Sequence, residues 1–411
     1  MEMKRIWICL LALLLLAGCG AEQRDEMVSW PEQNGLEPFK AEVEAQEGLT
    51  LSAEWEAYDP SIEAIWFTLE NNSGVEVSMG AEYSLERWLE GDSVPSDWYQ
   101  VPLVENAGWI TISYNLAPGE KFAQACNLSM FDYDFSDGGR FRVVKTVGDQ
   151  TLTAEFTLTE GAAISAETPY GFGPMEDLPE DWDTAEAAAS GAVVFTEAGM
   201  ENADAAETFL QKVSLGIPSQ LRTLQNYYES WPMLIDVIYE NDSFRWRMRT
   251  GGELTEKRFS YIVTDGTDVY LSNGADWDST ERYDSDKAFL LPSGSGGDLV
   301  PAAQELMADQ TAGSTIRYRI WSADGVWDAS LTETPTEFGV GWQRPGEGSG
   351  GSLYDLGNWY DEAPAITNIA WQADGTLCLT CRLEVGGVRT FDFDPETGHL
   401  TEGPVGDPAA E

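Results

Sequence analysis

The sequence predicts a mainly β protein, in which a β-sandwich is followed by an α+β module and then by a β-rich module with one short helix. Three observations support this prediction. Residues 48–160 consist of short alternating apolar and polar runs separated by turn residues, which is typical of a sandwich. After residue 184 a helical spacing of apolar residues interrupts the strand patterns. Beyond residue 310 the alternation returns, with Asp-Gly turn signals between the runs.

The start of the chain has the parts of a secretory signal peptide. Lys4 and Arg5 precede an uninterrupted apolar run over 6–17, and Leu16-Ala17-Gly18-Cys19 closes it. This ending resembles the lipobox of bacterial lipoproteins. The resemblance implies that residues 1–18 are removed and that the Cys19 thiol carries a diacylglycerol. It also implies that the lipid holds the chain on the outer, extracytoplasmic face of a membrane.

Two other interpretations of this segment are a membrane-spanning anchor and a signal peptide cut at an ordinary peptidase site. The apolar run is about twelve residues long, whereas a spanning helix needs roughly twenty. The Leu-Ala-Gly-Cys tetrad argues against the ordinary site, and Gly20 in place of Asp argues against inner-membrane retention in a Gram-negative cell. Residues 19–46 are polar and contain Pro31, Gly35 and Pro38, so we expect a flexible tether there.

Residues 47–160 are expected to form the sandwich. Asn71-Asn-Ser-Gly74 has turn chemistry, and so does the stretch over 132–139. That stretch does not match a calcium-binding loop, because loop positions six and twelve hold Asp137 and Val143 instead of Gly and Glu. The expected strands are 49–54, 64–70, 82–86, 98–101, 109–113, 121–125, 140–145 and 152–158.

These strands resemble a bacterial immunoglobulin-like domain of the kind found in extracytoplasmic proteins of Firmicutes. The residues that carry the resemblance are Tyr83-Ser-Leu-Glu86, Trp98-Tyr-Gln-Val-Pro102, Leu116-Ala-Pro-Gly119 and Phe141-Arg-Val-Val-Lys145. The resemblance implies an immunoglobulin-like β-sandwich and brings no catalytic residues. Cys126 has no partner for an inter-sheet disulfide, so we expect packed aromatics such as Trp66, Phe67 and Phe141 to stabilise the domain.

Residues 161–183 are rich in Gly, Pro and acidic residues and are interpreted as a linker. The α+β module is expected over 184–291, with helices at 184–190 and 202–213. Asn202 suits the cap of the second helix, whose buried face would hold Ala206, Phe209, Leu210 and Val213. The order of elements over about 184–272 resembles a Firmicutes lipoprotein module of unknown function, which implies an α+β fold and no activity.

One strand of this module carries a row of arginines. In 244–249 the period of two places Arg245, Arg247 and Arg249 on one face and the apolar residues on the other. On so acidic a chain this row is a candidate site for an anion or a partner. The alternative is pairing with carboxylates of neighbouring strands.

The β-rich module is expected over 292–411, with its helix at 301–309 and a three-stranded meander over 369–393. Residues 339–357 contain seven glycines and are interpreted as a long mobile loop. A Trp-x-Ala-Asp-Gly pattern occurs at Trp321 and again at Trp371, which predicts a recurring hairpin turn. Cys378 and Cys381 are three residues apart on a predicted strand, so their thiols should point to opposite faces and remain unpaired.

The composition restricts the function. The 411 residues include 71 acidic and 23 basic side chains, and a net charge of −48 argues against a nucleic-acid partner. His399 is the one histidine, which excludes a zinc site built from several histidines. Carboxylate pairs arise by chance among so many acids and carry little information. We therefore assign no catalytic residue, no metal ligand and no cofactor.

These observations favour a non-enzymatic, lipid-anchored protein that binds or displays an unidentified protein or glycan partner outside the cell. Two alternatives remain open. One is a sensor of the cell envelope or a regulator of a membrane partner. The other is a glycan-binding or glycan-active surface protein that uses some of the 16 tryptophans.

Overall fold

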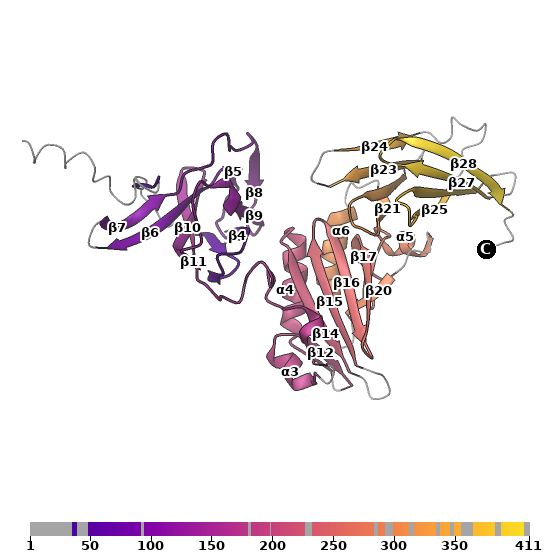
Figure 1. Ribbon diagram of the computed structural model, residues 1–411, viewed down its shortest axis with the longest axis horizontal. Coiled ribbons are helices and arrows are strands. Elements are labelled where there is room, and N and C mark those ends of the chain that lie inside the picture. The colour runs from indigo at the N-terminus through magenta and orange to yellow at the C-terminus, as the bar shows by residue number, and fades with distance from the viewer. Residues whose placement is uncertain are drawn as a thin grey trace, which may run out of the picture. The chain divides into compact units, whose positions relative to one another are not determined.

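The computed structural model describes residues 35–38, 48–91, 94–179, 182–197, 199–226, 232–282, 287–291, 299–311, 316–333, 338–345, 349–354, 365–382 and 388–406. The chain divides into two compact units, Met1–Gly171 and Phe172–Glu411. Strands dominate both units, as the sequence predicts, and Figure 1 shows them by label. Among the described residues, no helix is long and apolar enough to span a bilayer.

The first unit is a sandwich of two sheets. The smaller sheet has the order β2-β4-β9, and the larger has the path β1-β7-β6-β10-β11-β3, to which β5 and β8 are attached. The strands are β1 (Glu37–Pro38), β2 (Leu49–Ala53), β3 (Ala57–Tyr58), β4 (Ala64–Asn71), β5 (Val77–Gly80), β6 (Ser84–Gly91), β7 (Val94–Gln100), β8 (Ser113–Leu116), β9 (Lys121–Asn127), β10 (Gly139–Val147) and β11 (Gln150–Leu158), with one 3-10 turn, η1 (Leu128–Met130).

The core of the sandwich lies between the sheets, where Phe67 of β4 and Phe141 of β10 are both fully buried. Phe141 also stacks on Phe156 at a centroid distance of 5.8 Å. This confirms the expected aromatic core except at Trp66, which is half-buried because β4 alternates and places it on the outward side. Cys126 is buried and free, so the domain has no disulfide at that position.

A buried lysine links the two sheets. The Lys145 side chain is 0% exposed, and its Nζ donates to the carbonyl oxygens of Gly80 (3.0 Å) and Glu82 (3.2 Å). It also donates to Oε1 of Gln124 on the smaller sheet, at 3.1 Å. Burial lowers the pKa of Lys145 to about 8, because desolvation disfavours the charged form.

Two expectations for the first unit need correction. The predicted strand over 109–113 is absent, since β8 begins only at Ser113 and the preceding residues form no ladder. Part of the predicted tether over 19–46 belongs to the sandwich, because Leu36 is buried in its core and Glu37–Pro38 pair with β7 as β1. The remainder of the tether, apart from Gly35, lies outside the described residues, as does the predicted signal peptide.

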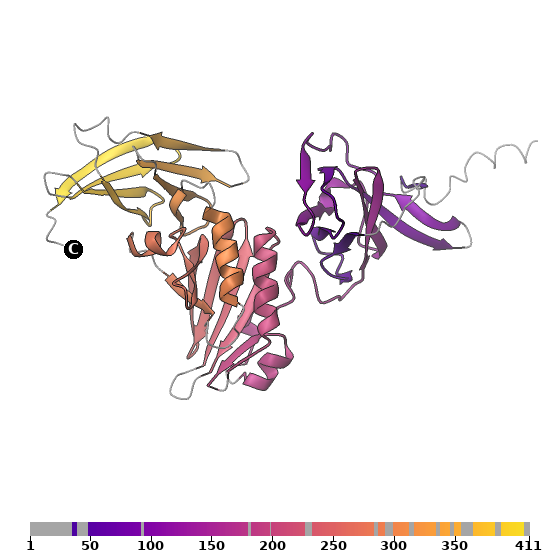
Figure 2. The ribbon, with the colours of Figure 1, turned by 180° about the vertical axis from the view of Figure 1, so that it is seen from behind.

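The second unit is built on a six-stranded sheet of order β13-β12-β14-β15-β16-β17. Two helices, α4 and α6, pack side by side on one of its faces (Figure 2), and their apolar residues share one core with the sheet. The elements are η2 (Met175–Asp177), α3 (Thr184–Ala189), β12 (Val193–Thr196), β13 (Gly199–Glu201), α4 (Ala203–Ser214), β14 (Ser219–Gln225), β15 (Met233–Glu240), β16 (Ser243–Thr250), β17 (Glu253–Phe259), β18 (Tyr261–Thr264), β19 (Val269–Ser272), α5 (Trp277–Arg282), β20 (Lys287–Leu291) and α6 (Leu299–Thr311).

Helix α4 has the predicted buried face, since Ala206, Phe209, Leu210 and Val213 all lie in the core. Asn202 stands at the predicted cap position, but its side chain does not cap the helix. It adopts a left-handed backbone (φ 58°), and its Nδ2 donates to the carbonyl oxygens of Ala188 (2.8 Å) and Ala192 (2.9 Å). Asn202 therefore ties the start of α4 to the end of α3.

The C-terminal part of the second unit consists of two four-stranded antiparallel meanders whose apolar residues share one core. In each, the predicted Asp-Gly turn closes the first hairpin, and Gly325 and Gly375 supply the positive φ (70° and 85°) that the turn requires. The strands are β21 (Ile316–Trp321), β22 (Asp328–Glu333), β23 (Phe338–Arg344), β24 (Ser349–Tyr354), β25 (Ala365–Trp371), β26 (Leu377–Arg382), β27 (Val388–Asp394) and β28 (His399–Gly406).

The predicted boundaries of the last module also change. The stretch 339–357 is not one long loop, because most of it forms the paired strands β23 and β24. The helix predicted at 301–309 is present as α6, but Ala303 and Leu306 pack in the α+β core and not in the core of the meanders. The α+β part therefore extends past residue 291, to the end of α6.

Candidate functional site

The six-stranded sheet carries charged rows on the face opposite to α4 and α6. Strand register places Arg222 of β14, Asp236 of β15, Arg247 of β16 and Glu256 of β17 directly beside one another in that order. The signs alternate along this row, as favourable cross-strand pairing requires. The predicted pairing of arginines with carboxylates of neighbouring strands is therefore confirmed for Arg247.

One end of this row is a buried ion pair. Arg222 Nε donates to Asp236 Oδ1 at 2.6 Å and Arg222 Nη2 donates to Oδ2 at 2.7 Å, with side chains only 3% and 1% exposed. Arg247 instead pairs with two half-exposed carboxylates, those of Glu176 and Glu256. The hydrogen bond from Arg247 holds the pKa of Glu176 below its usual value.

A segment from the predicted linker covers part of this face. We call residues 172–179 the strap. Met175 of the strap is 0% exposed and packs with Leu224 and Leu234 of the sheet. The backbone carbonyl groups of the strap accept hydrogen bonds from arginine side chains of the sheet. Arg222 Nη2 donates to Gly173 O at 2.7 Å. The linker prediction over 161–183 is corrected accordingly, because the units divide after Gly171 and the strap belongs to the second unit.

Arg249 is the main hydrogen-bond donor to the strap. Its Nη1 donates to the carbonyl oxygens of Met175 (2.7 Å) and Leu178 (2.8 Å), and its Nη2 donates to that of Pro179 at 3.0 Å. The short 3-10 turn η2 leaves these carbonyls on one side of the backbone, where one guanidinium can reach all three. The planar guanidinium of arginine carries several N–H donors in fixed directions, which suits hydrogen bonding to three carbonyl groups at once.

Arg245, Arg247 and Arg249 lie on one face as the sequence predicts, while Phe244, Trp246 and Met248 pack on the helix side. Each arginine has partners within the chain: Arg245 pairs with Glu240 at 3.4 Å, and the other two hold the strap. Binding of an anion or partner by this row stays a prediction. Sequence reasoning missed the strap because Pro- and Gly-rich segments resemble linkers, and its three large apolar residues, Phe172, Met175 and Leu178, follow no strand alternation.

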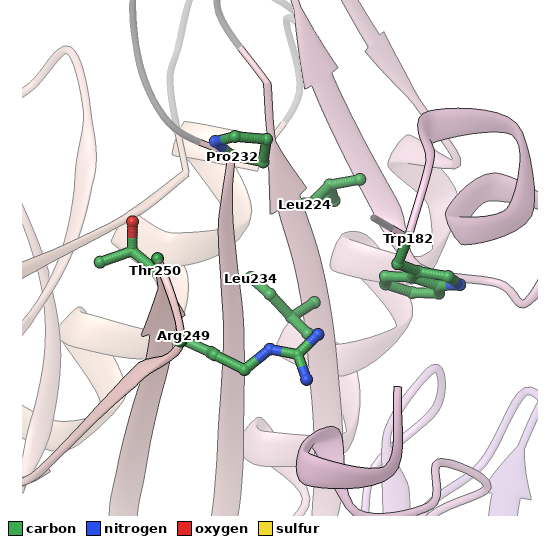
Figure 3. A pocket seen from close by; sticks show the side chains of 8 residues that line it. Trp182, Leu224, Pro232, Leu234, Arg249 and Thr250 are labelled. Atoms are coloured by element: carbon green, nitrogen blue, oxygen red, sulfur yellow. The ribbon is translucent and has the colours of Figure 1, made fainter. Parts of the chain in front are cut away.

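A small pocket of about 120 Å³ opens beside Arg249. Figure 3 shows Arg249 and Leu234 with Trp182 beside Leu224. Pro232 and the β16–β17 turn complete the wall, and Gly251 and Gly252 close that turn with φ of 54° and 83°. The pocket therefore combines an apolar wall with one cation whose hydrogen-bond partners are carbonyl groups.

The other predicted residues form no second site. Cys19 lies outside the described residues. Cys381 is buried in the meander core, whereas Cys378 on the same strand is half-buried, and both are free. His399 is exposed at the start of β28. Within the described ranges, no group of three or more His, Cys, Asp or Glu side chains could hold a metal ion.

Comparison with known proteins identifies the first unit. The model of the bacterial Ig-like domain family matches residues 45–157. Residues 45–157 form a bacterial Ig-like domain. The Ig-like domain fits an extracellular or surface protein. The match begins just before β2 and ends within β11, so it covers most of the sandwich and none of the second unit.

No curated protein matches the chain. Among solved structures, this chain is similar to the Pseudomonas fluorescens alkylpurine DNA glycosylase AlkC, which was solved bound to DNA containing an abasic site analog. The identity is 16% over 28% of this chain and 31% of the glycosylase chain, with a TM-score of 0.18. The chain thus spans about a third of that glycosylase. The Bacillus subtilis sporulation control protein Spo0M is similar at 10% identity over 65% and 100% of the two chains (TM-score 0.21). A putative 6-phosphogluconolactonase of Bacteroides uniformis follows at 12% over 90% and 73% (TM-score 0.17). These TM-scores support no assignment.

Proposed function

We propose that this protein is an extracytoplasmic lipoprotein, anchored through Cys19, that binds or displays a partner without chemical conversion. The single observation that carries the proposal is the basic-apolar-lipobox order ending in Leu16-Ala17-Gly18-Cys19 ahead of an Ig-like domain. Two acyl chains on one cysteine suffice for stable anchoring, because each buried CH₂ contributes about 0.8 kcal/mol.

The anchoring experiment compares the full chain with Cys19→Ala in cells fed with labelled palmitate. We expect label in the unsubstituted protein and its recovery with membranes, and loss of both in Cys19→Ala. Cys9→Ala is the matched control, because Cys9 lies within the predicted signal peptide and should not change labelling. Equal labelling of the Cys19→Ala chain, or recovery of the unsubstituted chain in the cytosol, contradicts the proposal.

For the binding activity, the best supported place is the pocket beside Arg249. Its apolar wall and single cation suit a small ligand, or a side chain of a partner, with an apolar ring and an anionic group. At about 120 Å³ the pocket is slightly smaller than the cavities of about 150 Å³ that take up benzene, so one ring is the largest apolar group that it can hold. Arg249 is half-buried and its recorded hydrogen-bond partners are neutral carbonyl groups, so they do not cancel the positive charge that would attract an anion.

Phenylacetate is a suitable probe, with benzyl alcohol as its uncharged counterpart, and ligand-observed NMR on the full chain is the assay. We expect phenylacetate to bind more tightly than benzyl alcohol, Trp182→Ala and Arg249→Met to weaken binding, and Arg249→Lys to retain part of it. Arg245→Ser is the control, because Arg245 does not line the pocket. Unchanged binding by Arg249→Met, or equal binding of the two probes, refutes this location.

A further inference from the structure

Three aromatic side chains gather on one face of the three-stranded sheet β18-β19-β20. Leu271 of β19 and Ala288 of β20 lie in the α+β core, so strand alternation places Tyr270 and Phe289 on the opposite face. These two residues pair across the strands, and their rings meet edge to face at a centroid distance of 5.9 Å. Trp277, at the start of α5, adds a third ring 5.4 Å from that of Tyr270. All three residues are half-buried, so the aromatic cluster of Tyr270, Trp277 and Phe289 is partly open to solvent.

The aromatic cluster already holds an ammonium group. Nζ of Lys287 lies 4.2 Å from the centroid of the Trp277 ring and 6.0 Å from that of Tyr270. At distances up to about 6 Å a cation is attracted by the negative face of a ring. Lys287 Nζ also donates to Oε1 of Glu281 at 2.7 Å, with side chains that are 37% and 57% exposed. Because an exposed ion pair contributes little free energy, the Lys287 side chain can leave the rings at low cost.

Carboxylates surround the rings. Besides Glu281 beside Lys287, Oδ2 of Asp265 lies 3.5 Å from the hydroxyl oxygen of Tyr270. Burial raises the pKa of Tyr270, and the negative charges of Asp265 and Asp268 raise it further. The electrostatic potential at the aromatic cluster is therefore negative, on a chain whose net charge is −48. A cation is attracted to this surface and an anion is repelled.

We propose that the aromatic cluster is a binding site for a small organic cation with a quaternary ammonium group, and that Lys287 is an internal occupant that this ligand displaces. A quaternary ammonium group is attracted by ring faces as the Lys287 ammonium is, and aromatic cages recognise such groups. It has no N–H donors, so it gives up less hydration than the strongly hydrated ammonium of lysine. The surrounding carboxylates favour a ligand with a net positive charge. Choline therefore fits the site, whereas the phosphate of a phosphocholine group is repelled.

The first experiment measures choline binding to the full chain by ligand-observed NMR. The controls are phosphocholine and the neutral analogue of choline in which a tert-butyl group replaces the trimethylammonium group. We expect choline to bind about threefold or more tightly than either one, and Trp277→Leu to weaken choline binding by a similar factor. Arg249→Met should leave choline binding unchanged, because the pocket beside Arg249 is lined by other residues. The proposal is overturned if choline does not bind, if a control ligand binds as tightly, or if Trp277→Leu has no effect.

The second experiment tests displacement of Lys287. Lys287→Ala removes the internal occupant and should tighten choline binding about threefold or more. Lys121→Ala is the matched control, because Lys121 is also an exposed lysine paired with a glutamate, Glu70, and its loss changes the net charge equally. This control also separates the local effect from the diffuse attraction of cations to an acidic chain. If Lys287→Ala binds choline no more tightly than Lys121→Ala does, Lys287 does not occupy a ligand site and the proposal fails.

Discussion

The buried pair of Arg222 and Asp236 gives the sharpest test of how the second unit is held together. Arg222→Ala removes the guanidinium but leaves the Asp236 carboxylate in a site where it is 1% exposed. Breaking a buried pair from one side costs about 3–5 kcal/mol, because the remaining charge is desolvated and uncompensated. Loss of the hydrogen bond to Gly173 O adds about 1 kcal/mol.

The expected total is about 4–6 kcal/mol in the free energy of unfolding of the second unit. For a unit of this size, 1 kcal/mol corresponds to about 2–4 °C in Tm, so the transition should fall by about 8–24 °C. Scanning calorimetry on the full chain is the assay, and the transition of the Ig-like domain serves as an internal reference, because neither residue belongs to it. The two units must be fitted separately, since a two-unit chain is not two-state.

Two further variants separate a buried-charge effect from general damage. Arg247→Ala lies in the same row but pairs with carboxylates that are 48% and 44% exposed, so it should cost below about 1 kcal/mol. Arg222→Met/Asp236→Leu removes both charges and should recover most of the loss. A cost below 1 kcal/mol for Arg222→Ala, or a double variant as unstable as the single one, would refute the reasoning.

The remaining predictions concern three other buried side chains. Met175→Ala should lower the free energy of unfolding of the second unit by about 2–5 kcal/mol in urea titrations, because Met175 is 0% exposed between strap and sheet; an unchanged midpoint contradicts the strap packing. The pKa of Lys145 is about 8 in the fold and 10.5 without burial, so its contribution to the free energy of unfolding should rise with pH between these two values. Denaturation midpoints measured over a pH series should show this rise, and Lys145→Met should remove it. Burial raises the pKa of the Cys381 thiol to about 11, so iodoacetamide should label the half-buried Cys378 before Cys381 in the native chain. Peptide mass mapping measures the labelling of each cysteine, and equal labelling of the two would contradict this prediction.

Local patterns in the sequence predicted much of the fold. The apolar run over 64–70 and the Asp-Gly turns predicted strands, because strand patterning and turn chemistry are properties of a few neighbouring residues. The buried face of α4 followed in the same way from its helical spacing. The Ig-like domain was recognised from its strands and from the run Phe141-Arg-Val-Val-Lys145, whose Phe and Lys prove to be fully buried.

The failures have a common physical origin. The strand predicted over 109–113 forms no ladder over 109–112, because a strand also needs a partner edge, which local sequence does not specify. The strap looked like a linker, because its attachment depends on its own carbonyl groups and on Arg249, more than seventy positions away in the chain. Helix α6 was assigned to the wrong module, because its pattern shows that one face is buried but not against which sheet.

The sequence by itself determined many of the strands, the helices over 184–190 and 202–213, the alternation that places three arginines on one face of β16, and the acidic character that argues against nucleic acid. Only the tertiary structure decided what those arginines contact. Charge and periodicity can be read from neighbouring residues of the sequence. The hydrogen-bond partner of a guanidinium depends instead on which distant part of the backbone the fold places beside it. In this protein that backbone is the strap, and its carbonyls turn a row that looked available for ligands into one that is largely occupied from within.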